Sequence, residues 1–161
     1  MRTTTYLTST IAIACLLMTT ASAEKANMSA EKLTKTATDV IVAEVRAIYT
    51  HQETIGQWQY TRYAAEIRVC EIEKGEGLQK GELAYVRYWE RRWGGAGFPP
   101  PSTSGHRGLP SKGDVVRVYL AQDAYDGFTR DNNDGGFNVI GANGFEVIKD
   151  GSDKKAEGSS P

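Results

Sequence analysis

Alternation of apolar and polar residues through the middle of the chain predicts β-strands. Residues 39–49 are rich in β-branched side chains, and residues 58–73 place Ala65, Ile67 and Val69 on one face. Glycine-containing turns separate these segments from further strands expected at residues 82–92, 115–120, 136–140 and 144–148. Because residues 141–143 lie between the last two strands, either a hairpin or one strongly bent strand fits them.

The segments on either side of this region differ from it. Residues 24–38 form a lead-in where Ser29 is suited to begin a short helix, although Lys32 stands where a capping box has an acidic residue. Residues 149–161 consist of polar residues and glycine, with little besides Ala156 that is apolar, and are predicted to be a disordered tail. The domain is therefore expected to span residues 39–148.

Strands with little helix indicate an all-β domain. At least two of the predicted strands exceed ten residues, and long twisted strands close their edges by coiling into a barrel. We therefore expect a small Greek-key barrel of the OB type with five or six strands, and a β-sandwich as the second choice.

The order of strands and turns resembles that of secreted bacterial proteins related to the TIMP-like and netrin-like OB domains. The segments that carry the resemblance are residues 39–45, 67–75 and 113–120. The resemblance implies an OB-type fold and an exported setting. It does not imply inhibition of metalloproteinases by zinc chelation, because the chain lacks the family's N-terminal cysteine and its disulfide cysteines.

The first residues have the form of a secretory signal. Arg2 precedes an apolar run at residues 11–18, and the small residues 21–23 match a signal peptidase site, so cleavage is expected after Ala23. Cys15 offers the alternative of a lipid anchor, but apolar residues continue past it. The mature chain is expected to be periplasmic or secreted and to have no transmembrane segment.

Charge and cysteine content narrow the choice of partners. The sequence has 19 Lys and Arg against 20 Asp and Glu, a formal net charge of −1, so a general polyanion binder and a nucleic-acid partner are not expected. After residue 23 the chain contains a single cysteine, Cys70, which excludes an internal disulfide. Its place inside a strand predicts a buried, inert thiol.

Candidates for catalysis are few. Ser102 or Ser104 could act as a nucleophile with His106 as base, but all three lie in a Gly- and Ser-rich loop, where a surface histidine is the simpler interpretation. A glycosidase would need paired carboxylates, and the strands offer Glu71, Glu73 and Glu90. No catalytic residue is assigned.

No cofactor and no metal site is expected. His51, His106 and Cys70 are too few and too scattered for a zinc site. Residues 131–136 combine Asp, Asn and Gly, as calcium loops do, but they fail the EF-hand register and suit a structural turn.

The strongest functional signal is a ladder of aromatic and cationic residues on the third strand. Its members are at alternate positions and so share one face: Tyr85, Arg87, Trp89, Arg91 and Trp93. The loop after the strand adds His106 and Arg107. The second strand contributes Trp58, Tyr60 and Arg62. This surface of an OB-type barrel commonly binds oligosaccharides or oligonucleotides.

Two interpretations of the ladder remain open. It can be the surface of an exported, non-enzymatic binding module that recognises an anionic glycan or a protein, the latter also through residues 98–101. It can instead be a satellite core, if residues 94–113 fold back over Trp89 and Trp93. The alternatives to a binding module are a secreted hydrolase, using His106 or the strand glutamates, and a purely structural envelope protein.

Overall fold

The computed structural model describes three stretches of the chain: residues 27–98, 104–122 and 136–149. The predicted signal sequence, Ser102, the tail beyond Lys149 and all of the candidate calcium turn except Gly136 lie outside these stretches. Among the described residues, no helix has the length and apolar character needed to cross a membrane.

The described residues form one short helix and six strands, so the prediction of a mostly β protein is confirmed. Ser29 caps the helix as expected, since its side chain accepts a hydrogen bond from the backbone N–H of Lys32 at 3.2 Å. The elements are α1 (Ala30–Thr36), β1 (Asp39–Ile55), β2 (Trp58–Lys74), β3 (Leu83–Trp93), β4 (Val115–Gln122), β5 (Phe137–Val139) and β6 (Phe145–Lys149).

All six strands belong to a single sheet, in the order β1-β2-β3-β5-β4-β6. β4 also pairs with β1, so that β1, β2, β3, β5 and β4 form a closed ring. The pairing of β3 with β5 is parallel, and the other pairings are antiparallel. β5 and β6 follow one another along β4 in the same direction, which excludes the hairpin, and a turn at residues 141–143 interrupts what would otherwise be one bent strand.

The core fills the inside of the ring. Alternation places Ala65, Ile67 and Val69 of β2 inward, as the sequence predicted, and each is at most 1% exposed. A smaller apolar cluster joins α1 to the outside of β4 through Leu33 and Tyr119. Burial of these two sets of side chains is the main source of stability expected for a domain without disulfides.

Cys70 is not the buried thiol that the sequence predicted. It follows the buried Val69, and because side chains alternate along a strand it points to the other side, where it is partly exposed. Its thiol lies 3.6 Å from the carbonyl oxygen of Arg68.

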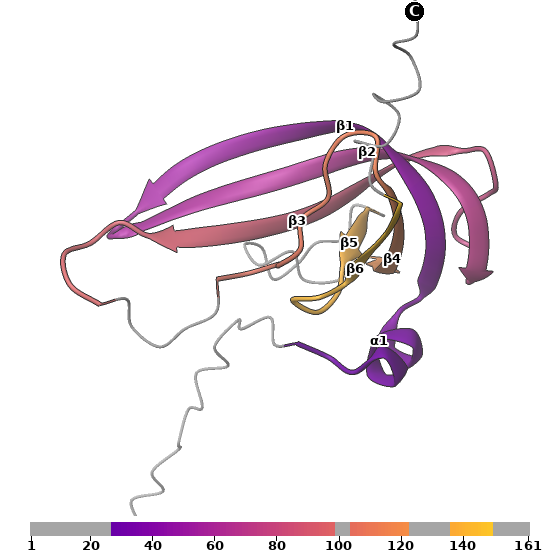
Figure 1. Cartoon of the computed structure of the whole chain (residues 1–161), viewed down its shortest axis with the longest axis horizontal. Coiled ribbons are helices and arrows are strands. Elements are labelled where there is room, and N and C mark those ends of the chain that lie inside the picture. The colour runs from indigo at the N-terminus through magenta and orange to yellow at the C-terminus, as the bar shows by residue number, and fades with distance from the viewer. Residues whose placement is uncertain (1–26, 99–103, 123–135, 150–161) are drawn as a thin grey trace, which may run out of the picture.

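β1, β2 and β3 extend well beyond the ring. β1 was expected to end at Tyr49 but continues to Ile55, where a two-residue turn with Gly56 at φ +61° connects it to β2. The far halves of the three strands project together to one end of the molecule, away from β4, β5 and β6 (Figure 1). We call this projection the arm, and it comprises residues 47–64 and 88–93.

A candidate binding face on the arm

The register between β2 and β3 gathers the predicted ladder onto one face. Trp58 lies opposite Trp93, and Tyr60 lies opposite Arg91. Directly opposed residues of antiparallel strands share a face of the sheet. We call this the ladder face; its residues on β1, β2 and β3 are Ala47, Tyr49, His51, Glu53, Ile55, Trp58, Tyr60, Arg62, Ala64, Glu66, Tyr85, Arg87, Trp89, Arg91 and Trp93.

At the tip of the arm, an arginine is held between aromatic rings. The guanidinium carbon of Arg91 lies 4.4 Å from the centroid of the Trp58 ring, and its Nη1 donates a hydrogen bond to the Tyr60 hydroxyl at 3.1 Å. Trp93 meets Trp58 edge-on, with ring centroids 5.1 Å apart. These contacts fix the guanidinium and both indoles before any ligand arrives.

Nearer the ring, two exposed tyrosines flank a small side chain. The rings of Tyr49 and Tyr85 lie 6.4 Å apart and are 54% and 55% exposed. Ala64 is the cross-strand neighbour of both Tyr49 and Arg87, so a small side chain lies between these two on the face. The Tyr85 hydroxyl donates to a carboxylate oxygen of Glu66 at 2.9 Å, which raises the pKa of Tyr85 and keeps it a neutral hydrogen-bonding group.

Trp89 does not belong to the accessible part of this face. It is only 3% exposed, whereas the binding hypothesis placed it in solvent. Residues 104–106 pair with the edge of β3: Arg91 N–H donates to the Ser104 carbonyl at 2.8 Å, and His106 N–H donates to the Trp89 carbonyl at 2.9 Å. Gly105 approaches so closely that a Cβ there would lie 2.8 Å from the indole. The covering-loop interpretation is therefore right for Trp89.

His106 is buried, so the prediction of a surface histidine is wrong. It is 2% exposed; its Nε2 lies 3.0 Å from the Val139 carbonyl oxygen, and its Nδ1 lies 3.1 Å from the Trp89 backbone nitrogen. Nδ1 also lies 2.9 Å from the Trp89 carbonyl oxygen, so it faces both polar groups of the Trp89 backbone, and whether it accepts from the N–H or donates to the carbonyl depends on the tautomer. With both nitrogens bonded to backbone, the ring fastens β5 to β3 and is poorly placed to serve as a general base.

Glu73 and Glu90 are not brought together. Glu90 accepts a 2.7 Å hydrogen bond from the Tyr63 hydroxyl on the arm, and Glu73 is bound in a bidentate manner by Arg117 at 2.8–3.0 Å. Glu90 lies opposite Thr61. Since Glu73 is twelve residues further along β2, the separation is about 40 Å along the strand, whereas glycosidase carboxylates stand within about 10 Å. Their convergence is excluded for this pair.

The chain matches no protein-family model, no curated protein and no solved structure with which it was compared. The functional assignment therefore depends on the geometry of the face itself. Within the three described stretches, no group of three or more His, Cys, Asp or Glu side chains is arranged to hold a metal ion.

Some of the face was missed from the sequence. Tyr49 and the rest of β1 were not included, because residues 50–54 are all polar and carry no alternation that would have extended the strand to Gly56. Arg107, which was included, has an exposed side chain, and its backbone N–H donates to the Ala142 carbonyl at 2.7 Å. It follows His106 on the segment that covers the β3 edge.

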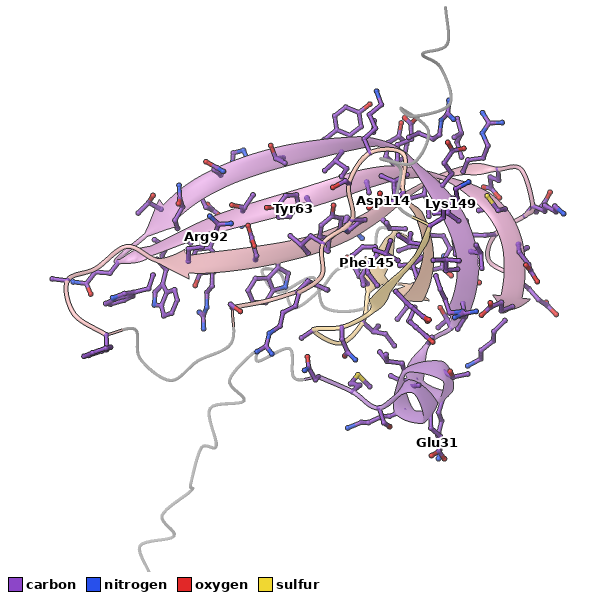
Figure 2. All side chains as sticks on the ribbon, in the orientation of Figure 1. Glu31, Tyr63, Arg92, Asp114, Phe145 and Lys149 are labelled. Atoms are coloured by element: carbon purple, nitrogen blue, oxygen red, sulfur yellow. The ribbon has the colours of Figure 1, made fainter. Side chains whose placement is uncertain are left out.

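Behind the ladder face, two stacked tyrosines predict an alkaline transition. Burial and the hydrogen bond to Glu90 raise the pKa of Tyr63, labelled in Figure 2, to about 12. The ring of Tyr88 stacks on that of Tyr63 with 4.8 Å between the ring centroids, and burial raises the pKa of Tyr88 as well. The folded protein therefore holds these hydroxyls in the neutral form more strongly than the unfolded chain does. Their contribution to stability is complete below about pH 10, the pKa of unfolded tyrosine, and is lost as pH rises through 12.

We therefore expect the free energy of unfolding to fall between pH 10 and pH 12, measured by urea denaturation. Tyrosinate absorbance should show late titration of Tyr63 and Tyr88, beside that of Tyr85. Tyr63→Phe should flatten part of the pH dependence of stability. A flat stability profile in the native protein over this range would contradict the assignment.

Proposed function

We propose that this protein is an exported, non-enzymatic binding module that holds an anionic glycan along the ladder face of its arm. The observation that carries the proposal is the pre-ordered set of Arg91, Trp58, Tyr60 and Trp93 at the tip. Flat rings stack on the apolar faces of sugars, and guanidinium groups form bidentate hydrogen bonds with carboxylate or sulfate.

The dimensions of the face suit a polymer. Tyr85 and Trp93 are eight residues apart on β3, which is about 27 Å at 3.4 Å per residue. A chain of several sugar units would meet the tyrosines near the ring at one end and the tip cluster at the other. A small metabolite would use only a fraction of this surface.

The charge on the face favours an anionic ligand. Three arginines, Arg62, Arg87 and Arg91, lie on it with two carboxylates, Glu53 and Glu66. Glu53 pairs with Arg62, and Glu66 accepts from Tyr85. The local excess of positive charge is small, which suits a ligand with spaced acidic groups better than the dense phosphates of nucleic acid.

The topology supports an OB-type barrel as the scaffold. β1, β2 and β3 are consecutive antiparallel strands, and β4 returns by a long connection to lie beside β1, which is the Greek-key order 4-1-2-3. OB barrels commonly use the faces of strands 2 and 3 for oligosaccharides and oligonucleotides, and the ladder face is built on those two strands.

The binding test is calorimetric titration with a uronic-acid oligosaccharide and a neutral one of equal length. We expect saturable binding of the acidic ligand that weakens with added salt. Tyr85→Ala and Trp93→Ala should each weaken it by about 1–2 kcal/mol, or about five- to thirtyfold.

The matched control is Phe98→Ala, because Phe98 is 98% exposed but lies beyond the end of β3. This variant should bind like the parent protein. Equal binding of both oligosaccharides would contradict the role of the arginines, and no binding of either would contradict the glycan proposal.

A further inference from the structure

The outer edge of β1 is open along the arm. β4 pairs with β1 only over residues 39–44, and the last backbone bonds to this edge join Val45 to Gly113 and Asp114. From Ala47 to Ile55, no strand of the described parts of the chain pairs with the outer edge, while the inner edge follows β2 in unbroken register. Figure 1 shows β1 as the outermost strand of the arm.

This edge lacks the features that prevent strands from adding to one another. Natural edge strands are commonly blunted by proline, lysine, bulges or short length. The nine residues from Ala47 to Ile55 contain neither proline nor lysine, and the register shifts of β1 all occur before Ala47. Five of the nine are β-branched or aromatic residues, which favour strands. Glu53 carries a charge and His51 can carry one, and the other residues except Tyr49 have no titratable side chain.

The sequence of the edge is complementary to itself. In an antiparallel pairing of two copies centred on Gln52, the Tyr49 of each lies opposite the Ile55 of the other, and both side chains are more than half exposed in the single chain, at 54% and 53%. The same register places His51 opposite Glu53, whose carboxylate pairs with Arg62 within its own chain and has a second oxygen that can accept from the imidazole. A pair of an aromatic and a β-branched residue, such as Tyr49 with Ile55, is a favourable cross-strand combination.

Other registers are less favourable. Centring on His51 sets the two histidines against each other and Tyr49 against Glu53. Centring on Thr50 sets Ile55 against Val45, where the edge is already bonded to Gly113 and Asp114. Centring on Gln52 stops short of that obstruction, because Ile55 of the second copy reaches only to Tyr49.

We propose that two copies of this chain join through antiparallel pairing of their β1 edges about Gln52. The three-stranded arms then form one continuous six-stranded sheet. Because opposed residues share a face, the two ladder faces merge into a single surface. This inference depends on the edge alone, and the dimer is expected whatever the ladder face binds.

Charge complementation at the two-fold axis tests the proposal. Gln52 is exposed and meets its own copy there, so Gln52→Lys and Gln52→Glu each place like charges directly opposite. By analytical ultracentrifugation, we expect the parent protein to be a dimer, each variant alone to be a monomer, and an equal mixture of the two to be a heterodimer. Gln59→Lys, which is exposed on the interior strand β2, should remain a dimer.

A covalent trap checks the register independently of charge. In a chain with Cys15 and Cys70 replaced by serine, Gln52→Cys should form a disulfide-linked dimer on oxidation, because paired residues lie within the Cα distance that a disulfide spans. Thr54→Cys should not, since its copy lies four residues along the strand. A monomeric parent protein, a dimer unaffected by both charged variants, or crosslinking at Thr54 in place of Gln52 would each overturn the proposal.

Discussion

Replacing Trp89 with alanine is expected to lower the free energy of unfolding by about 3–5 kcal/mol, the range for truncating a large buried aromatic side chain. The indole is 3% exposed and lies against Tyr60 and His106, with ring centroids 6.5 and 6.3 Å away. Truncation would leave a cavity beneath Gly105, whose backbone is fixed by hydrogen bonds on both sides. Urea denaturation followed by circular dichroism measures the loss without relying on tryptophan emission.

Two further variants show whether burial is the cause. Trp89→Phe keeps much of the ring and should lose less than half as much as the alanine variant. Tyr85→Ala, on the same face but 55% exposed, should change stability by no more than about 1 kcal/mol. If Trp89→Ala behaved like Tyr85→Ala, the indole would be solvent-exposed, and the whole ladder would again be a candidate for ligand contact.

Most of the secondary structure follows from local sequence patterns. Alternation of small and β-branched residues gives the strands their inward faces, as at Ala65 and Ile67, and Ser29 supplies the helix cap. The face on which each ladder residue lies was also predictable, because alternation has a fixed period of two. These features depend on neighbours within a few residues of the chain.

The errors arise where contact partners are distant in sequence. Alternation assigned Trp89 to a face of the sheet but did not reveal that residues 104–106 pair with the edge of β3 and cover the indole. Composition alone made that segment resemble a surface loop, because Ser104 and Gly105 are equally common in solvent and in close backbone contact. The burial of His106 depends on Val139, which is thirty-three residues away. The error for Cys70 has the opposite cause, because the local pattern was sufficient: alternation from the buried Val69 places the thiol on the outer side of β2.

The position at which β1 leaves the ring and enters the arm could not be predicted from the sequence pattern either. Nothing in residues 47–55 distinguishes a strand that closes the ring from one that continues past it. The limit is set by β4, which has eight residues and reaches only part of the seventeen in β1. The open edge is therefore a consequence of unequal strand lengths, and so is the exposure of the ladder face.

His106→Ala is expected to lower the free energy of unfolding by about 2–6 kcal/mol, because removing a partner from a buried polar group costs about 1–3 kcal/mol and the imidazole serves two. Its bonds to the backbone of Trp89 and Val139 tie β3 to β5, at the parallel pairing that closes the ring. Urea denaturation measures the loss, and the exposed neighbour Arg107→Ala should change stability by less than about 0.5 kcal/mol. A hydrolase with His106 as base requires a different result, in which His106→Ala folds as stably as the parent protein and loses turnover alone. A stability loss below about 1 kcal/mol would favour that alternative, because it would mean that the imidazole nitrogens do not hold β3 and β5 together.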